Sequence, residues 1–80
     1  MMNKKEELLT ITMEECAEVA IECSKMLRFD NAPFKLEKEI GDLLCMFRLL
    51  ESNNILSLKE TEDQIAEKEK KLKRWSNVID

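Results

Sequence analysis

The sequence has no histidine, one glycine, one proline and few aromatic residues, which make up 5% of its 80 positions. Turns depend on Gly and Pro, and strands favour aromatic and β-branched side chains. This composition argues against a β-protein and predicts an all-α chain. The absence of histidine, together with the absence of a Cys-x-x-Cys spacing, argues against a zinc site.

Basic charge and long hydrophobic runs are also scarce. There are 13 Lys and Arg against 17 Asp and Glu, a formal net charge of −4, so we expect no nucleic-acid partner. The segment 8–13 is too short and too polar for a secretory signal, and no run approaches membrane-spanning length. We therefore expect a cytoplasmic protein without a membrane partner, whose thiols at Cys16, Cys23 and Cys45 are reduced.

The short length limits the core. A chain of this size forms one domain, 1–80, and buries only about 60% of the surface that its unfolded form exposes. Oligomerisation is a common remedy for such a small core. We therefore predict a homodimer or homotetramer.

Three helices are expected from the hydrophobic periodicity and the capping signals. The first runs from about Lys4 to Arg28, with a Thr12–Glu15 capping box as a later alternative start. The second follows the turn at 29–33 and ends near Glu51. The third opens with a Ser57–Glu60 capping box and continues to about residue 75. Together they predict a small antiparallel helical bundle that is completed by oligomerisation.

Each expected helix has an apolar stripe. The stripes are Leu9, Met13, Cys16, Ala20, Cys23 and Leu27 in the first helix, Leu36, Ile40, Leu43, Phe47 and Leu50 in the second, and Leu58, Ile65, Leu72 and Trp75 in the third. We expect the first two helices to pack through their stripes, with the third on them or on a partner subunit. The cysteines are interpreted as small buried hydrophobes, and the mid-helix Gly41 predicts a close backbone approach.

Acidic residues occur in pairs on the first two helices. Glu15 with Glu18, and Glu39 with Asp42, are spaced i,i+3 and border the apolar stripes. Packing of the two helices would bring four carboxylates to one partly desolvated place, where they repel one another unless a cation binds. Oxygen ligands without His or Cys suit Mg²⁺, or Mn²⁺ in its place, and such ions typically bridge carboxylates to a substrate phosphate.

The acidic segments resemble the signature of the MazG-like all-α NTP pyrophosphatases, a family that includes dimeric dUTPases and phosphoribosyl-ATP pyrophosphatases. The signature is EExxE, a spacer, then ExxD. The matching segments are Glu14-Glu15-Cys16-Ala17-Glu18 and Glu39-Ile40-Gly41-Asp42. The resemblance spans roughly 9–50 and extends more weakly to the basic tail that ends at Arg74 and Trp75.

The resemblance implies a Mg²⁺-dependent hydrolase that cleaves a nucleoside triphosphate between its α and β phosphates, giving the monophosphate and pyrophosphate. It implies that Glu15, Glu18, Glu39 and Asp42 hold the metal, and that Glu14 assists a second ion or orients the attacking water. Glu14 and Glu15 are thus the expected catalytic residues. Metal-ion chemistry agrees with this, since a bound cation lowers the pKa of its water and offsets charge on the leaving group.

The C-terminal end departs from the family. Many members carry an Asn among the basic residues there, where this chain has Lys70-Lys71-Leu72-Lys73-Arg74-Trp75. The candidate phosphate ligands are the basic residues Arg28, Lys38, Lys70, Lys71 and Arg74.

Several alternatives stay open. The chain could be a non-catalytic helical interaction module whose acidic cluster binds cations or a basic partner, or a phosphoribosyl-ATP pyrophosphohydrolase. Glu22 is interpreted as a surface charge paired with Lys25. Trp75 is interpreted as a packing residue, with stacking on a nucleobase as the alternative. Asn53 and Asn54 either reach a substrate or end the second helix.

Overall fold

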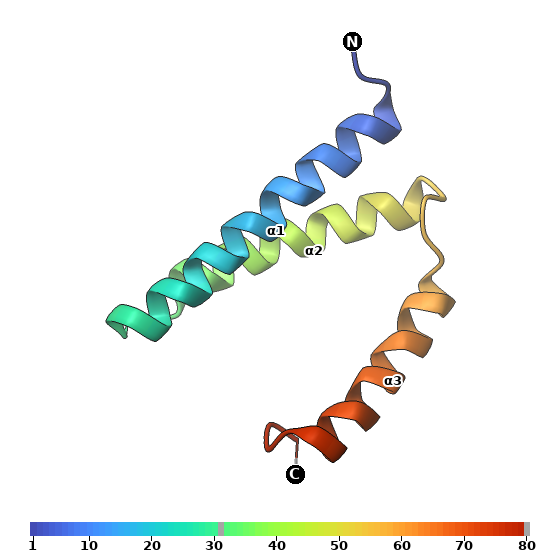
Figure 1. Cartoon of the computed structure of the whole chain (residues 1–80). Helices are drawn as coiled ribbons and strands as arrows, with labels where there is room; N and C mark the ends of the chain where they lie inside the picture. Colours follow the sequence, from blue (N-terminus) through green and yellow to red (C-terminus); the bar gives the residue numbers. More distant parts are fainter. Residues whose placement is uncertain (31, 80) are drawn as a thin grey trace.

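The protein is all-α. The computed structural model describes residues 1–30 and 32–79, and in this part the chain forms α1 (Lys4–Phe29), α2 (Phe34–Ser52) and α3 (Leu58–Trp75), without a strand (Figure 1). The bounds agree with the predicted helices to within one residue at each end. Of the predicted Asp-Asn turn, Asn31 lies outside the described residues. Asp30 ends α1 in a left-handed conformation with φ 51° and donates its N–H to the carbonyl of Met26.

The start of α1 is fixed by a capping box that the sequence analysis placed elsewhere. The Asn3 side chain accepts from the Glu6 N–H at 2.8 Å, and the Glu6 carboxylate accepts from the Asn3 N–H at 3.1 Å. The predicted alternative at Thr12 is wrong, because the Thr12 hydroxyl donates to the carbonyl of Leu8 inside the helix. Of the predicted Ser57–Glu60 capping box, the N-cap is confirmed, since the Ser57 hydroxyl accepts from the Glu60 N–H. The reciprocal bond from the Ser57 N–H to the Glu60 carboxylate is not found among the described residues.

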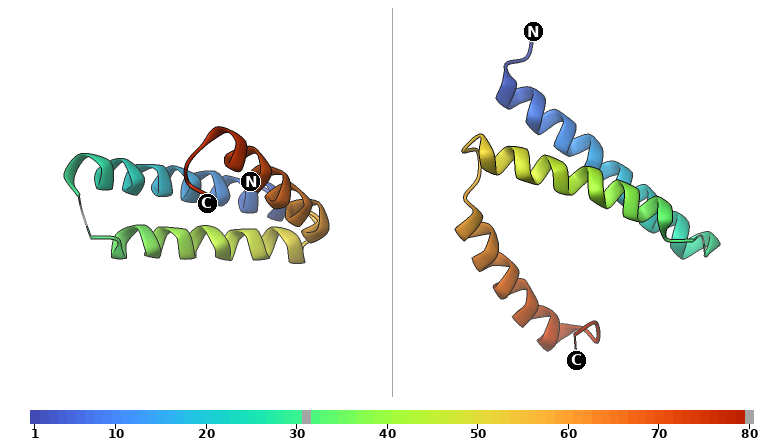
Figure 2. Two further views of the ribbon diagram at one scale, coloured as in Figure 1. Left: turned by 90° about the horizontal axis from the view of Figure 1, so that it is seen from below. Right: turned by 180° about the vertical axis from the view of Figure 1, so that it is seen from behind.

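α1 and α2 pack as an antiparallel hairpin (Figures 1 and 2). The residues between the two helices are buried or half-buried and recur at spacings of three and four. They form what we call the seam: Leu8, Thr12, Glu15, Val19, Glu22 and Met26 from α1, with Leu36, Glu39, Leu43, Met46 and Leu50 from α2 and Asn53, which caps α2. Leu8, Met46 and Leu50 form its buried core, with Ile11 and Ile55 packed against them. Both helices thus meet through a coiled-coil-like pattern.

The predicted packing face of α1 is wrong by one residue. The predicted stripe, from Leu9 to Leu27, follows the seam by one position, which turns it by about 100°. Met13 is 72% exposed and Leu27 is 89% exposed, and all three cysteines of the chain are exposed. We call this exposed set, Leu9, Met13, Cys16, Ala20, Cys23 and Leu27, the α1 stripe. The cause of the error is that the true seam contains two glutamates and a threonine, so hydrophobicity is stronger beside it.

The stripe predicted for α2 is half right. Leu36, Leu43 and Leu50 lie in the seam, whereas Ile40 and Phe47 remain exposed. The expected close approach at Gly41 is also wrong for the described residues, because a Cβ placed there meets nothing within 4 Å.

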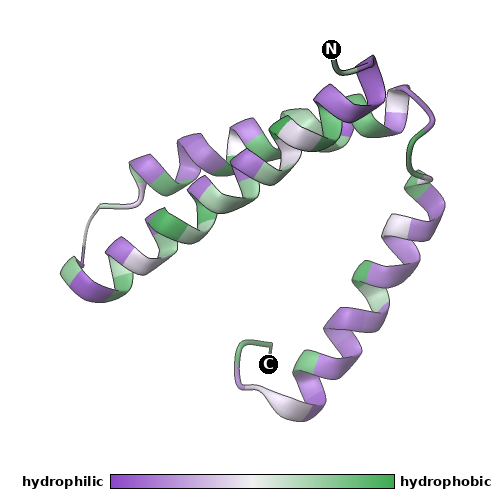
Figure 3. Ribbon diagram, turned by 45° about the horizontal axis from the view of Figure 1, so that its top comes forward, coloured by the Kyte–Doolittle hydropathy of each residue, from purple (hydrophilic) through white to green (hydrophobic). Residues whose placement is uncertain are grey.

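α3 stands apart from the hairpin (Figures 1 and 2). Hydrophilic residues cover most of it, with isolated hydrophobic positions between them (Figure 3). Ile65 and Trp75 are largely exposed, so Trp75 does not act as a packing residue within the described chain. None of the described helices is sufficiently long and apolar to cross a bilayer.

Adjacent leucines on α2 provide a test of this packing. Leu50 is 3% exposed and Leu49 is 40% exposed. We expect Leu50→Ala to lower the free energy of unfolding by about 2–4 kcal/mol, because it leaves a cavity in the buried core that Leu50 forms with Leu8 and Met46. Leu49→Ala should cost less than about 1 kcal/mol. Urea unfolding of both variants at one protein concentration measures the difference, and equal losses would contradict the described orientation of α2.

Candidate metal centre

Three carboxylates from two helices converge at the middle of the hairpin. Glu15 of α1 and Glu39 of α2 lie half-buried in the seam, and Asp42 follows Glu39 by nearly one turn. One oxygen of each lies within 4.8 Å of the others. We call Glu15, Glu39 and Asp42 the carboxylate group.

The register of the hairpin explains this convergence. Leu8 and Leu50 pack together in the core at one end. Because the helices run in opposite directions, a step of seven residues from each leads to Glu15 and Leu43, at about the same level of the seam. Glu39 and Asp42 precede Leu43 by one turn or less, so both reach toward Glu15. The i,i+3 spacing seen in the sequence is therefore what places two α2 carboxylates opposite one from α1.

The electrostatic consequence appears at Glu15. Burial raises the pKa of its carboxyl above the ordinary value, and the negative charges of Asp42, Glu39, Glu18 and Glu14, in that order, raise the pKa further. Four neighbouring carboxylates therefore act on Glu15. In the absence of a cation, protonation of the Glu15 carboxylate relieves this repulsion.

Glu14 and Glu18 lie at the edge of this arrangement. Each precedes a seam position by one residue, so both are exposed on the same side of the hairpin as Asp42. They act on Glu15 through their charge, but they are not members of the carboxylate group. The Glu18 side chain would have to rotate before its carboxylate could reach a cation that is held by the carboxylate group.

Glu22 is the residue whose position the sequence analysis missed. It is 8% exposed and lies in the seam, seven residues after Glu15, so its interpretation as a surface charge is wrong. It does pair with Lys25, at 3.5 Å. The signal was the spacing: Leu8, Glu15 and Glu22 recur every seven residues, which marks a single line along a packed helix.

The candidate phosphate ligands are scattered in the single chain. Lys38 lies one turn before Asp42 on the same helix. Arg28 instead stacks on the ring of Phe29, with 4.9 Å between its guanidinium carbon and the ring centroid. The remaining three lie on α3 around an open hollow of about 270 Å³, which is lined by Glu67, Lys70, Lys71, Arg74 and Trp75.

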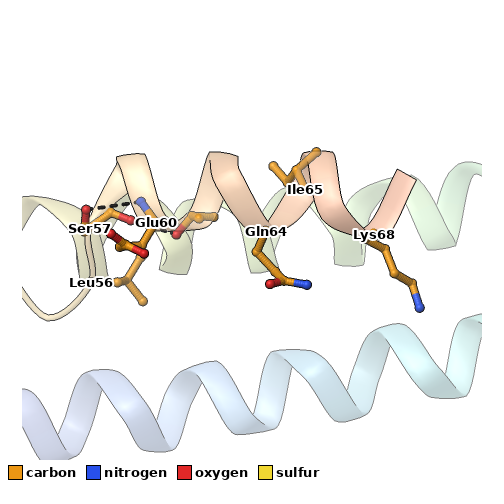
Figure 4. Close-up of a pocket in the computed structure, with 7 residues that line it drawn as sticks. Leu56, Ser57, Glu60, Gln64, Ile65 and Lys68 are labelled. Carbon is orange, nitrogen blue, oxygen red and sulfur yellow. Dashed lines mark hydrogen bonds between the residues drawn. The ribbon is translucent and has the colours of Figure 1, made fainter. Parts of the chain in front are cut away.

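Four hollows among the described residues are lined by side chains other than those of the carboxylate group. An open one of about 460 Å³ follows one side of α3 from Leu56 to Lys68 (Figure 4). Another, of about 350 Å³, lies at the end of the hairpin where Leu8 and Leu50 pack, and is lined by Lys4, Lys5, Leu8, Asn53, Asn54 and Ile55. Asn53 donates to the carbonyl of Leu49 at 2.7 Å and so helps to end α2.

The ligand chemistry of the carboxylate group fits a hard divalent cation. Its donors are oxygens alone, and the chain contains no histidine that would favour a softer metal. The raised pKa of Glu15 shows that negative charge is already crowded at this place. A cation bound by these three side chains would offset that repulsion, and three protein ligands would leave positions for water or phosphate.

Comparison with known protein families gives a match over most of the chain. A family profile described as the MazG nucleotide pyrophosphohydrolase domain matches residues 3–76, which include all three helices and the complete carboxylate group. No curated protein and no solved structure matches the chain in the corresponding searches.

The raised pKa of Glu15 predicts how stability depends on pH. The folded chain holds this proton more tightly than the unfolded chain, so in EDTA the free energy of unfolding should fall as the pH rises through the raised pKa. Asp42→Asn removes a charge that acts on Glu15, so this loss should be smaller and the melting temperature in EDTA at neutral pH should be higher. Excess Mg²⁺ should stabilise the wild type more than the variant.

Thermal unfolding across pH, with EDTA and with Mg²⁺, measures both effects. Glu7→Gln is the control, because Glu7 is exposed on α1 and is not among the charges that act on Glu15. Identical pH profiles and identical responses to Mg²⁺ for the wild type and Asp42→Asn would mean that the carboxylates do not interact.

Proposed function

The chain belongs to the MazG nucleotide pyrophosphohydrolase domain family, and from this premise we propose that it hydrolyses a (deoxy)nucleoside triphosphate to the monophosphate and pyrophosphate. The observation that carries the proposal is the carboxylate group, three acidic side chains from two helices with their oxygens within 4.8 Å. Such a group has little use in a purely structural hairpin, because it weakens the packing of the seam.

We propose Mg²⁺, with Mn²⁺ as a substitute, as the cation of this site. Glu15, Glu39 and Asp42 would hold it, and Glu18 would join them after a side-chain rotation. When bound, such an ion supplies a Lewis acid that lowers the pKa of water and draws negative charge from the phosphates.

The other carboxylate at the site has a separate role in this proposal. Glu14 is exposed beside the group, where its carboxylate can accept a proton from the attacking water. The oxygen of the water then bonds to one of the two phosphorus atoms of the anhydride between the α and β phosphates. The bond from that phosphorus to the bridging oxygen breaks, and the monophosphate and pyrophosphate separate. No nucleophilic side chain is required.

Basic side chains would balance the charge of the triphosphate. Lys38 is the nearest of the candidates along the chain, since it lies on α2 beside the carboxylate group. Lys70, Lys71 and Arg74 lie on α3, which stands apart from the hairpin. We therefore propose that the enzyme is a homodimer or homotetramer in which a second copy supplies its α3 residues. The three free thiols also lead us to propose a reducing compartment such as the cytoplasm.

The activity test uses the α2 ligands. We expect Glu39→Ala and Asp42→Ala each to reduce turnover to less than about a tenth of the wild-type value at saturating Mg²⁺, because loss of a direct metal ligand removes transition-state stabilisation. Glu7→Ala, on an exposed acid away from the site, should keep wild-type turnover. Phosphorus NMR of the products measures the reaction and distinguishes pyrophosphate from inorganic phosphate.

The substrate panel should contain the canonical (deoxy)nucleoside triphosphates, modified ones and phosphoribosyl-ATP. Release of pyrophosphate from phosphoribosyl-ATP alone would move the substrate assignment to that compound. Cation binding without hydrolysis of any member would favour the non-catalytic interaction module.

A further inference from the structure

The side of the hairpin that carries the carboxylate group, which we call the acidic side, carries lysines as well. Glu14, Glu18 and Asp42 each precede a seam position by one residue. Because the helices are antiparallel, this step turns the side chains of α1 and α2 toward the same side of the hairpin. Three lysines precede seam positions in the same way, Lys25, Lys35 and Lys38. The acidic side therefore has acids at its middle and lysines toward the end where α1 leads into α2.

Glu22 is a buried acid that the proposed reaction does not use. It is 8% exposed and lies in the seam, where a carboxylate weakens the packing. Its carboxylate pairs with the half-buried Lys25 at 3.5 Å. The Glu67–Lys70 pair on α3 has the same spacing and the same distance, yet both of its side chains are exposed. Pairing alone therefore does not require a seam position, whereas a carboxylate fixed by packing holds its lysine in one place.

The pairing draws Lys25 toward the carboxylate group. A step of seven residues from Glu15 along α1 leads to Glu22, and the same count along α2 makes Leu36 its counterpart across the seam. Lys25 lies nearly one turn beyond Glu22, so the bond brings its ammonium group back toward Glu15. Lys38 lies on the opposite helix, and its side chain leans toward the level of Leu36. Both lysines thus reach one place, about 10 Å along the seam from Glu15.

Two ammonium groups next to oxygen ligands for a cation suit a diphosphate. Lysine binds phosphate oxygens as a point charge, and a hard divalent cation binds them from the other side. A diphosphate is long enough to contact both at once. The β and γ phosphates of a nucleoside triphosphate form such a group.

We propose that Glu22 is a positioning residue that fixes Lys25, and that Lys25 and Lys38 form a diphosphate subsite next to the carboxylate group. The inference rests on the proposed function, since the diphosphate is the part of the triphosphate that leaves as pyrophosphate. The subsite belongs to the hairpin itself and needs no residue of α3.

Binding of inorganic pyrophosphate in excess Mg²⁺, measured by calorimetry, tests the subsite without hydrolysis. Lys25→Met should weaken this binding at least about tenfold, because a charge-assisted contact is lost. The matched control is Lys59→Met, which removes the lysine of an exposed ion pair on α3, 2.8 Å from Asp63, and should bind as wild type. Circular dichroism verifies that each variant is helical.

Two substitutions at Glu22 separate its position from its charge. Both Glu22→Leu and Glu22→Gln remove a negative charge, but only Gln keeps an oxygen that can accept from Lys25. Positioning predicts at least about tenfold weaker pyrophosphate binding by Glu22→Leu and a change within about threefold for Glu22→Gln. Charge alone predicts tighter binding by both. Glu22→Leu should also unfold at higher urea, because an apolar side chain replaces a buried charge, so its weaker binding would not come from unfolding.

The double variant tests whether Glu22 acts through Lys25. Adding Glu22→Leu to Lys25→Met should cost no further pyrophosphate affinity, and it leaves no unpaired charge in the seam. With a nucleotide that the wild type hydrolyses, Glu22→Leu should raise KM at least about tenfold and keep kcat within about threefold, because the phosphates carry their charge before the reaction begins. Loss of a metal ligand lowers kcat instead.

The outcomes distinguish this subsite from the proposed reaction. Unchanged pyrophosphate affinity in Lys25→Met, or tighter binding by both Glu22 variants, would refute the subsite and leave the hydrolase intact. A wild type that binds no pyrophosphate in Mg²⁺ would refute the subsite whether or not it is active. An inactive wild type whose pyrophosphate binding depends on Lys25 and Glu22 as described would refute the proposed reaction and support the subsite.

Discussion

The structure depends on one constraint, which is that the seam between α1 and α2 must hold carboxylates as well as apolar side chains. Leu8, Met46 and Leu50 give the seam a hydrophobic end, while Glu15, Glu39 and Glu22 lie farther along it among apolar residues. Among the described residues, no large side chain is completely buried. The hairpin therefore gains little free energy from burial and is opposed by charge repulsion. A bound cation or a second copy would stabilise it by contributions that the single chain lacks.

The same seam divides the hairpin into two chemically different sides. A step of one residue along a helix turns a side chain by about 100°, so neighbours in the sequence belong to different surfaces. Cys16 follows Glu15 and belongs to the exposed α1 stripe, whereas Glu14 precedes it and lies on the acidic side with Glu18 and Asp42. Acidic side chains and an exposed apolar surface are thus separated within a single turn of helix.

Local signals in the sequence were sufficient for the helices and for the acidic pairs. Caps, a turn and the hydrophobic period define where α1, α2 and α3 begin and end, and the i,i+3 spacing of Glu39 and Asp42 is a property of one helix. The face of α1 that packs against α2 could not be predicted in this way. Periodicity ranks stripes by hydrophobicity and does not distinguish a stripe that packs within the chain from one that remains exposed. The true seam, with Glu15 and Glu22 in it, is the less hydrophobic of the two, so the cysteines were assigned to the core and Glu22 to the surface.

The position of α3 relative to the hairpin could not be predicted from the sequence of α3, because it depends on contacts with other parts of the protein. Its apolar residues Leu58, Ile65 and Leu72 recur every seven positions, while Thr61 and Lys68 occupy the intermediate places where a wider stripe would have further apolar side chains. Because this line is narrow, packing it against the hairpin of its own chain would bury little apolar surface and would stabilise the contact only weakly. Its C-terminal end carries the basic residues Lys70, Lys71 and Arg74, opposite in sign to the carboxylate group. The acidic and basic residues of the proposed site thus lie on parts of the chain that do not pack together, and either a movement of α3 or the approach of a second copy would bring them together.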